Sequence, residues 1–143
     1  MEKLKEKFKK IVEDLGYYLY DVIYEKRGND YVLEILIEND TFIDIDDCVI
    51  VSKTLSEELD INDPFNEAYN LEVASSGAER ELRNSEEIER AIGKNVYIET
   101  MDQKFEGKLK SFKDGFLEVL QKNKRTTKVN YIDVSYIRLT IIF

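Results

Sequence analysis

The 143-residue sequence contains no histidine, a single cysteine and a single proline. The absence of histidine removes the commonest general base and metal ligand, together with the nucleophiles that histidine activates. The single cysteine, Cys48, allows neither a disulfide within the chain nor a paired-cysteine metal or redox site. We therefore expect a protein that is not an enzyme, with no catalytic residue, no metal and no cofactor.

Long apolar segments are also missing. No apolar run approaches the ~20 residues that a helix needs to cross a bilayer. The opening sequence, MEKLKEKFKK, lacks the apolar centre of a secretory signal. These two absences lead us to expect a cytoplasmic protein that does not contact a membrane.

The net charge of −9 is distributed unevenly along the chain. Residues 1–84 hold 10 Lys/Arg against 21 Asp/Glu, a net of −11, whereas residues 91–143 hold 10 against 6, a net of +4. An acidic surface repels phosphate backbones and attracts basic proteins. The acidic part therefore either receives a basic partner or serves only to keep the protein in solution.

Hydrophobic periodicity over residues 1–84 predicts an αββαβ domain with a three-stranded sheet. We expect an amphipathic first helix, a hairpin of strands 17–26 and 31–38, a second helix over 46–59 and a third strand over 69–74. Strict alternation along the first strand places Leu19 and Val22 on opposite faces. Cys48 falls on the apolar face of the second helix, so we expect an inert, buried thiol. The apolar face of the first helix carries Leu4, Phe8, Ile11, Val12 and Leu15.

Residues 85–143 predict a linker helix followed by an all-β domain. Asn84 caps this helix, and Ile88, Ala91 and Ile92 are expected to face inward. Beyond it the periodicity is two, and Asp114-Gly115 is a strong hairpin turn. The pattern predicts an Sm-like (SH3-like) five-stranded small barrel, so the whole chain is expected to be an α+β protein. We also expect a monomer. The expected strands are 96–100, 104–112, 116–121, 126–130 and 134–140, with Gly107 at a bend.

Two specific hypotheses, a metal site and an RNA-binding KH module, compete with simpler explanations of the same residues. The carboxylates Asp44, Asp46 and Asp47 suggest a metal-dependent enzyme, but an EF-hand loop from Asp40 fails because position six is Ile45 and not glycine. Capping of the second helix by Asp44 or Asp46, with compensation of its macrodipole, explains the same residues. A KH-type RNA module needs a GXXG loop, and no two of the six glycines are three residues apart. We reject a KH module that clamps RNA through GXXG, although a looser relationship of fold remains open. The metal site requires that the carboxylates converge.

The segment from Tyr69 to Leu82, YNLEVASSGAEREL, resembles the signature of the RimP family, which usually reads YxLEVSSPGxDRPL. Leu15-Gly16-Tyr17 with Asp21-Val22 is similar to the opening motif of that family. Asp46-Asp47-Cys48 is similar to its second-helix motif. The resemblance extends over roughly residues 10–140. Ser76 and Glu81 stand where the family usually has proline and Ala74 replaces a serine, so this loop is expected to be more mobile.

The resemblance implies an αββαβ domain packed on an Sm-like barrel. It also implies a ribosome maturation factor that binds the free 30S subunit and aids placement of small-subunit ribosomal protein twelve, with 16S rRNA as a further contact. By the same resemblance, the signature residues contact the partner or fix the angle between domains; they are Ser75, Gly77, Glu79 and Arg80. The alternative for Arg80 is that it only ties the loop to its own domain.

A second function class is a general RNA-binding or RNA-chaperone module that acts through the positively charged barrel. The simpler interpretation is that these cations only solvate the barrel surface. The candidate contacts are Lys104, Lys108, Lys110, Lys124, Arg125 and Lys128.

Overall fold

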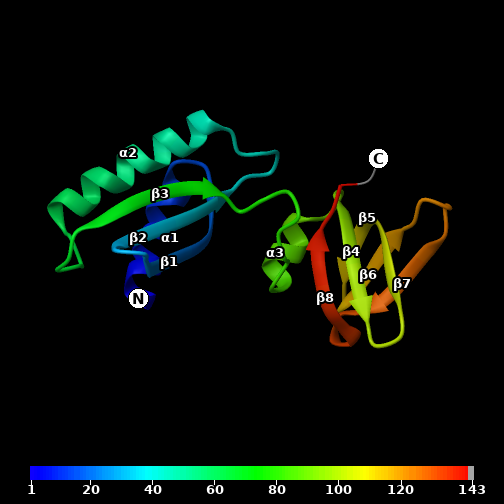
Figure 1. Cartoon of the computed structure of the whole chain (residues 1–143). Helices are drawn as coiled ribbons and strands as arrows, with labels where there is room; N and C mark the ends of the chain where they lie inside the picture. The colour runs from blue at the N-terminus through cyan, green and yellow to red at the C-terminus, as the bar shows by residue number, and fades with distance from the viewer. Residues whose placement is uncertain (142–143) are drawn as a thin grey trace. The chain divides into compact units, whose positions relative to one another are not determined.

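The computed structural model describes residues 1–141 (Figure 1). The chain is α+β and divides into two units, Met1–Gly77 and Ala78–Phe143. The sequence pattern predicted the boundary after residue 84. Residues 78–84 group with the second unit because Leu82 is buried in its core and donates its amide to the Ile137 carbonyl at 2.9 Å. Within residues 1–141 no helix is both long and apolar enough to span a bilayer.

The first unit has the predicted αββαβ order. Its elements are α1 (Glu2–Asp14), β1 (Tyr18–Arg27), β2 (Asp30–Glu38), α2 (Ile45–Ile61) and β3 (Tyr69–Ser75). The three strands form a sheet in the order β1-β2-β3, with β1 antiparallel and β3 parallel to β2. The parallel pairing follows from the helical crossover α2 between β2 and β3 (Figure 1).

Both helices of this unit contribute to one apolar core against the sheet. Phe8 and Val12 of α1 are fully buried, as the helical arc predicted. Each apolar side chain of this size stabilises the fold by about 1.5–3 kcal/mol when it is fully buried. The rest of the core consists of Val22, Leu33, Ile35, Ile37, Val51, Leu55 and Leu59.

The strict alternation predicted for the first strand is wrong at one point. Leu19 pairs with Ile37, but Asp21 pairs with the adjacent Leu36, so Tyr20 is an extra residue on β1. Such a bulge changes which side chains face the core. Leu19 therefore packs on the same core as Val22, although the pattern placed them on opposite faces.

The second unit consists of α3 (Ser85–Arg90) and five antiparallel strands in the order β7-β6-β5-β4-β8, the order of an Sm-like barrel. A short 3-10 turn, η1 (Tyr131–Asp133), precedes the last strand. All five predicted strands are confirmed, with ends that differ by a residue. They are β4 (Asn95–Thr100), β5 (Lys104–Lys113), β6 (Phe116–Leu120), β7 (Thr126–Asn130) and β8 (Val134–Leu139).

The core of the second unit includes Ile88 and Ala91 of the α3 segment, as predicted. Ile92 is 43% exposed, so its predicted inward position is wrong. The amides of Ala91 and Ile92 donate to Ile88 and Glu89, which are the three-residue bonds of a 3-10 turn. This tighter winding moves Ile92 out of the phase that an α-helix would give it.

Gly107 lies where the backbone of β5 comes close to its antiparallel neighbour β6. A Cβ atom at this position would stand 2.8 Å from Cγ1 of Val119 and even closer to the Leu120 carbonyl oxygen. Backbone and buried core cannot retreat from such a contact, so only glycine fits at this close approach. A bend of the barrel at Gly107 stays a prediction.

Candidate functional site

The first part of the signature segment continues the sheet of the first unit. The Ser76 amide donates to the Ile37 carbonyl at 2.9 Å, and the Ser76 hydroxyl donates to buried Glu38 at 3.4 Å. The Gly77 amide donates to Oγ of Ser75 at 3.1 Å, and Gly77 has a φ of +103° that favours glycine. The serine at position 76 thus supplies a ladder bond that proline has no N–H to make.

The second part of the segment is tied to β8 within the second unit. The Leu139 amide donates to the Arg80 carbonyl at 3.0 Å, and the Leu82 amide donates to Ile137 at 2.9 Å. Glu81 lies opposite Arg138 in this isolated bridge. The backbone of Arg80 therefore anchors the segment to its own unit. The bridge uses no backbone group of Glu81, so a proline at position 81 would leave its bonds intact.

Arg138 is a residue of this region that sequence reasoning missed. Its Nη1 atom donates to the Leu139 carbonyl at 3.1 Å and lies 3.7 Å from Oε1 of Glu79. Its guanidinium group stands 4.7 Å from the centre of the Tyr97 ring, a cation–π contact. Burial, followed by a hydrogen bond to Glu99, raises the pKa of Tyr97. Arg138 is invisible in the sequence pattern because its role depends on the pairing of β8 with β4 and with the signature segment.

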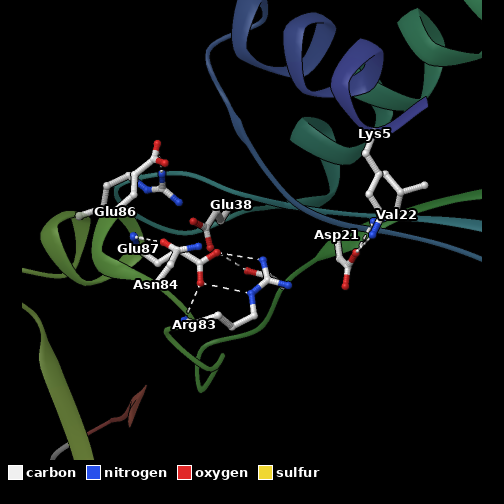
Figure 2. A network of polar contacts seen from close by, with 10 residues as sticks. Lys5, Asp21, Val22, Glu38, Arg83, Asn84, Glu86 and Glu87 are labelled. Atoms are coloured by element: carbon white, nitrogen blue, oxygen red, sulfur yellow. Dashed lines mark hydrogen bonds and ion pairs between the residues drawn. The ribbon is translucent and has the colours of Figure 1, made fainter. Parts of the chain in front are cut away.

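A bidentate ion pair holds the start of α3. Nη2 of Arg83 lies 2.9 Å from Oε2 of Glu87, and Nε of Arg83 donates to Oε1 at 3.2 Å (Figure 2). The Arg83 amide also donates to Oε1 at 2.7 Å, while Oδ1 of Asn84 caps the helix. Burial raises the pKa of Glu87, but the bonds from Arg83 outweigh it, and the net result is a lowered pKa. The predicted cap is confirmed, although the Glu87 carboxylate accepts the amide of Arg83 and not that of Asn84.

The carboxylates at the start of α2 form a capping box. Asp44 accepts the Asp47 amide and Asp47 accepts the Asp44 amide, both at 2.9 Å, as the capping interpretation predicted. Asp47 also accepts the Tyr17 hydroxyl at 2.5 Å, a bond that raises the pKa of Tyr17 to about 12 and lowers the pKa of Asp47. Among residues 1–141 no group of three carboxylates or thiols is arranged to hold a metal ion.

Cys48 is half-buried, whereas the helical pattern predicted a buried thiol. Burial, followed by the charge of Asp47, raises the pKa of the Cys48 thiol. Because the thiolate is the reactive form, this shift keeps the side chain unreactive.

The six barrel cations singled out in the sequence are all exposed, but they do not form one cluster. Lys108 of β5 pairs with Leu120 of β6, which pairs in turn with Thr126 of β7. Lys108 therefore lies near the turn that carries Lys124 and Arg125. Lys104 lies opposite Glu99 at the other end of β5, and Lys128 lies opposite Glu118. The whole second unit holds 13 Lys/Arg against 11 Asp/Glu, so carboxylates interrupt its positive charge.

Lys128 also lies 4.9 Å from the centre of the Phe116 ring. A separate hollow of about 890 Å³ opens beside β7, between the turn at Met101 and the turn at Ile132. Lys128 is the only one of the six candidate cations that lines it.

Comparison with protein families decides the identity of the first unit. Residues 7–79, just over half of the chain, match the RimP N-terminal domain. The chain belongs to the RimP family. RimP proteins are ribosome maturation factors and not a known enzyme family. The match includes Tyr17 and Asp47, so two segments that carried the sequence resemblance meet in space through one hydrogen bond. It also includes Asp21, whose Oδ1 atom lies 3.4 Å from Nζ of Lys5. Figure 2 labels both residues.

Proposed function

We propose that this protein binds the free 30S subunit during its maturation and aids the placement of small-subunit ribosomal protein twelve. Membership of the RimP family is the observation that carries this proposal. The charge of the first unit supports it, because residues 1–77 hold 19 Asp/Glu against 8 Lys/Arg. A net charge of −11 on this unit favours a basic polypeptide over bare RNA as its first contact.

The contribution of the protein is binding and not chemistry. The conspicuous carboxylates at the start of α2 are engaged in capping, and the thiol of Cys48 has a raised pKa. In this proposal the protein acts in the cytoplasm as a monomer and leaves once the subunit has matured. Contacts to 16S rRNA come from the barrel cations that lie near one another, Lys108, Lys124 and Arg125.

The signature segment is proposed as a contact site because backbone bonds fix both of its ends. Ser75 and Gly77 lie in the turn that follows β3, and the Arg80 backbone is bonded to β8. The Glu79 side chain is 61% exposed and only 3.7 Å from Arg138, so a basic partner can compete for it. Arg80 would meet a phosphate or carboxylate of the assembling subunit.

Genetic complementation tests the proposed function. A strain that lacks the gene should accumulate precursors of the 30S subunit, and the wild-type chain should restore the profile. Glu79→Lys should restore it poorly, whereas Glu13→Lys, an equal charge change on the exposed face of α1, should restore it fully. A normal subunit profile in the deletion strain would refute the proposed function.

General RNA binding through the barrel is the second candidate. It is favoured by the exposure of all six cations, none of which forms an ion pair with a carboxylate of the described residues. Binding driven by phosphates weakens steeply with salt, because each neutralised phosphate releases a counterion. Affinity for unrelated RNA should therefore be measured across salt concentrations. A flat response or no binding would dispose of this candidate.

A further inference from the structure

The strand β3 is an open edge of its sheet. The sheet order is β1-β2-β3, and within residues 1–141 no strand pairs with the outer side of β3. The Ser76 amide bonds to β2, and bonding alternates along a parallel strand, so the amide and carbonyl groups of Leu71 and Val73 point to the open edge. An unpaired strand edge is a template for another extended chain.

A groove of about 480 Å³ lies between α2 and β3, and Val73 is the residue of β3 that lines it. Two of its apolar side chains are unusually exposed for their size, Ile45 at 78% and Val49 at 60%. Figure 1 shows α2 passing alongside β3. The groove is lined by Ile45, Cys48, Val49, Ser52, Lys53, Ser56 and Val73.

Carboxylates lie at both ends of the groove. Asp44 and Asp46 flank Ile45, and Asp60 continues the helix stripe four residues beyond Ser56. Asp63 stands at the start of β3, where it accepts the Tyr69 hydroxyl at 3.2 Å. Lys53 is the only cation in the lining. An occupant with apolar side chains on one face and positive charges around them matches this arrangement.

We propose that an extended, basic segment of a partner protein adds a fourth strand to β3 and places its apolar side chains in the groove against α2. Main-chain hydrogen bonds to Leu71 and Val73 give this mode its affinity, and the groove selects alternate side chains. The inference rests on the proposed function only in taking the partner to be a protein of the assembling subunit. The binding chemistry itself depends on the edge, the groove and the charge.

The test uses the full chain and a fluorescent peptide of about ten residues, the upper length of a typical strand, in which lysine and valine alternate. Anisotropy should show binding of this peptide and no binding of its counterpart with glutamate in place of lysine. Val49→Lys should weaken binding about tenfold or more, because it removes a buried apolar contact. Ile50→Lys is the matched control, since Ile50 is 48% exposed on the same helix and does not line the groove.

A second variant pair addresses the strand edge. Val73→Pro removes the outward N–H together with the valine side chain and keeps the ladder to β2, so it should abolish binding. Val73→Ala removes most of the side chain and keeps the N–H, so it should reduce binding modestly. Lys53→Glu should strengthen binding several-fold. Failure of the wild-type chain to bind the lysine peptide, or equal losses in Val49→Lys and Ile50→Lys, would overturn the inference. So would a dimer of this chain that Val73→Pro dissociates, because a second copy would then be the occupant.

Binding to 30S particles, measured in parallel, separates this inference from the proposed function. If wild type and Val49→Lys bind 30S particles equally while neither binds the peptide, the groove proposal fails and the proposed function stands. If the wild-type chain binds the peptide but no ribosomal particle, the proposed function fails and the groove remains a binding site for basic segments.

Discussion

The ion pair between Arg83 and Glu87 leads to a quantitative prediction about the stability of the second unit. Glu87→Gln keeps the shape of the side chain and removes its charge. Glu87 is 7% exposed and its carboxylate accepts three bonds from Arg83, at 2.7, 2.9 and 3.2 Å. Hydrogen bonds to a charged group contribute about 1.5–3 kcal/mol to stability. The Arg83 side chain is 35% exposed, so water replaces part of the hydrogen bonding that it loses in the variant. We expect a loss of about 2 kcal/mol.

Thermal unfolding followed by circular dichroism measures this loss. For a unit of this size, 2 kcal/mol corresponds to a decrease of about 8–16 °C in the melting temperature. Glu86→Gln is the control, because Glu86 is 67% exposed and pairs with Arg90 at 3.4 Å, and it should cost less than about 0.5 kcal/mol. Equal effects of the two variants would refute the assignment of Glu87 as a buried anchor.

The pH dependence of the same variant is a further check. The folded-state pKa of Glu87 is lowered, so its contribution is fully present above the ordinary carboxyl pKa of 4.5 and is lost as the pH falls through the lowered value. The difference between wild type and Glu87→Gln should therefore be greatest near neutral pH and should shrink below about pH 4.5. A difference that stays constant down to pH 3 would show that packing and not charge is responsible.

Three more predictions concern other positions. Gly107→Ala should destabilise the second unit by about 1–3 kcal/mol through overpacking, while the adjacent Glu106→Ala should change urea unfolding little. Tyr17→Phe removes the hydrogen bond to Asp47 and should lower the free energy of unfolding by about 1 kcal/mol at neutral pH. An unchanged urea midpoint would contradict a stabilising role of that bond. Glu81→Pro should stabilise the chain by about 0.4–1 kcal/mol because it restricts the unfolded state, and a lowered melting temperature would show that the bridge to β8 is strained.

The sequence alone predicted the features that depend on local periodicity. The αββαβ order, the five barrel strands and the cap at Asn84 all follow from patterns within a few residues of each position. The pattern left Asp44 and Asp46 as alternative caps of α2, and the structure has Asp44. The bulge at Tyr20 and the exposure of Ile92 were missed because each depends on a single change of register or winding. Both changes are small in sequence and decide which face a side chain occupies.

The candidate site was less predictable than the fold. The signature segment and its residues came from family resemblance, whereas Arg138 required the pairing of distant strands. The barrel cations were identified by residue type, but the register separates Lys104 from Lys108 and interleaves carboxylates among them. The open edge of β3 also required the sheet order, since periodicity does not reveal which strand lies outside.

Sedimentation with purified ribosomal particles tests the central claim most directly. The full chain is mixed with free 30S subunits or with 70S ribosomes and separated on a sucrose gradient. Our account predicts that the chain travels with 30S subunits and is absent from the 70S fractions. A chain that stays at the top of both gradients, or that travels equally with both particles, would contradict it.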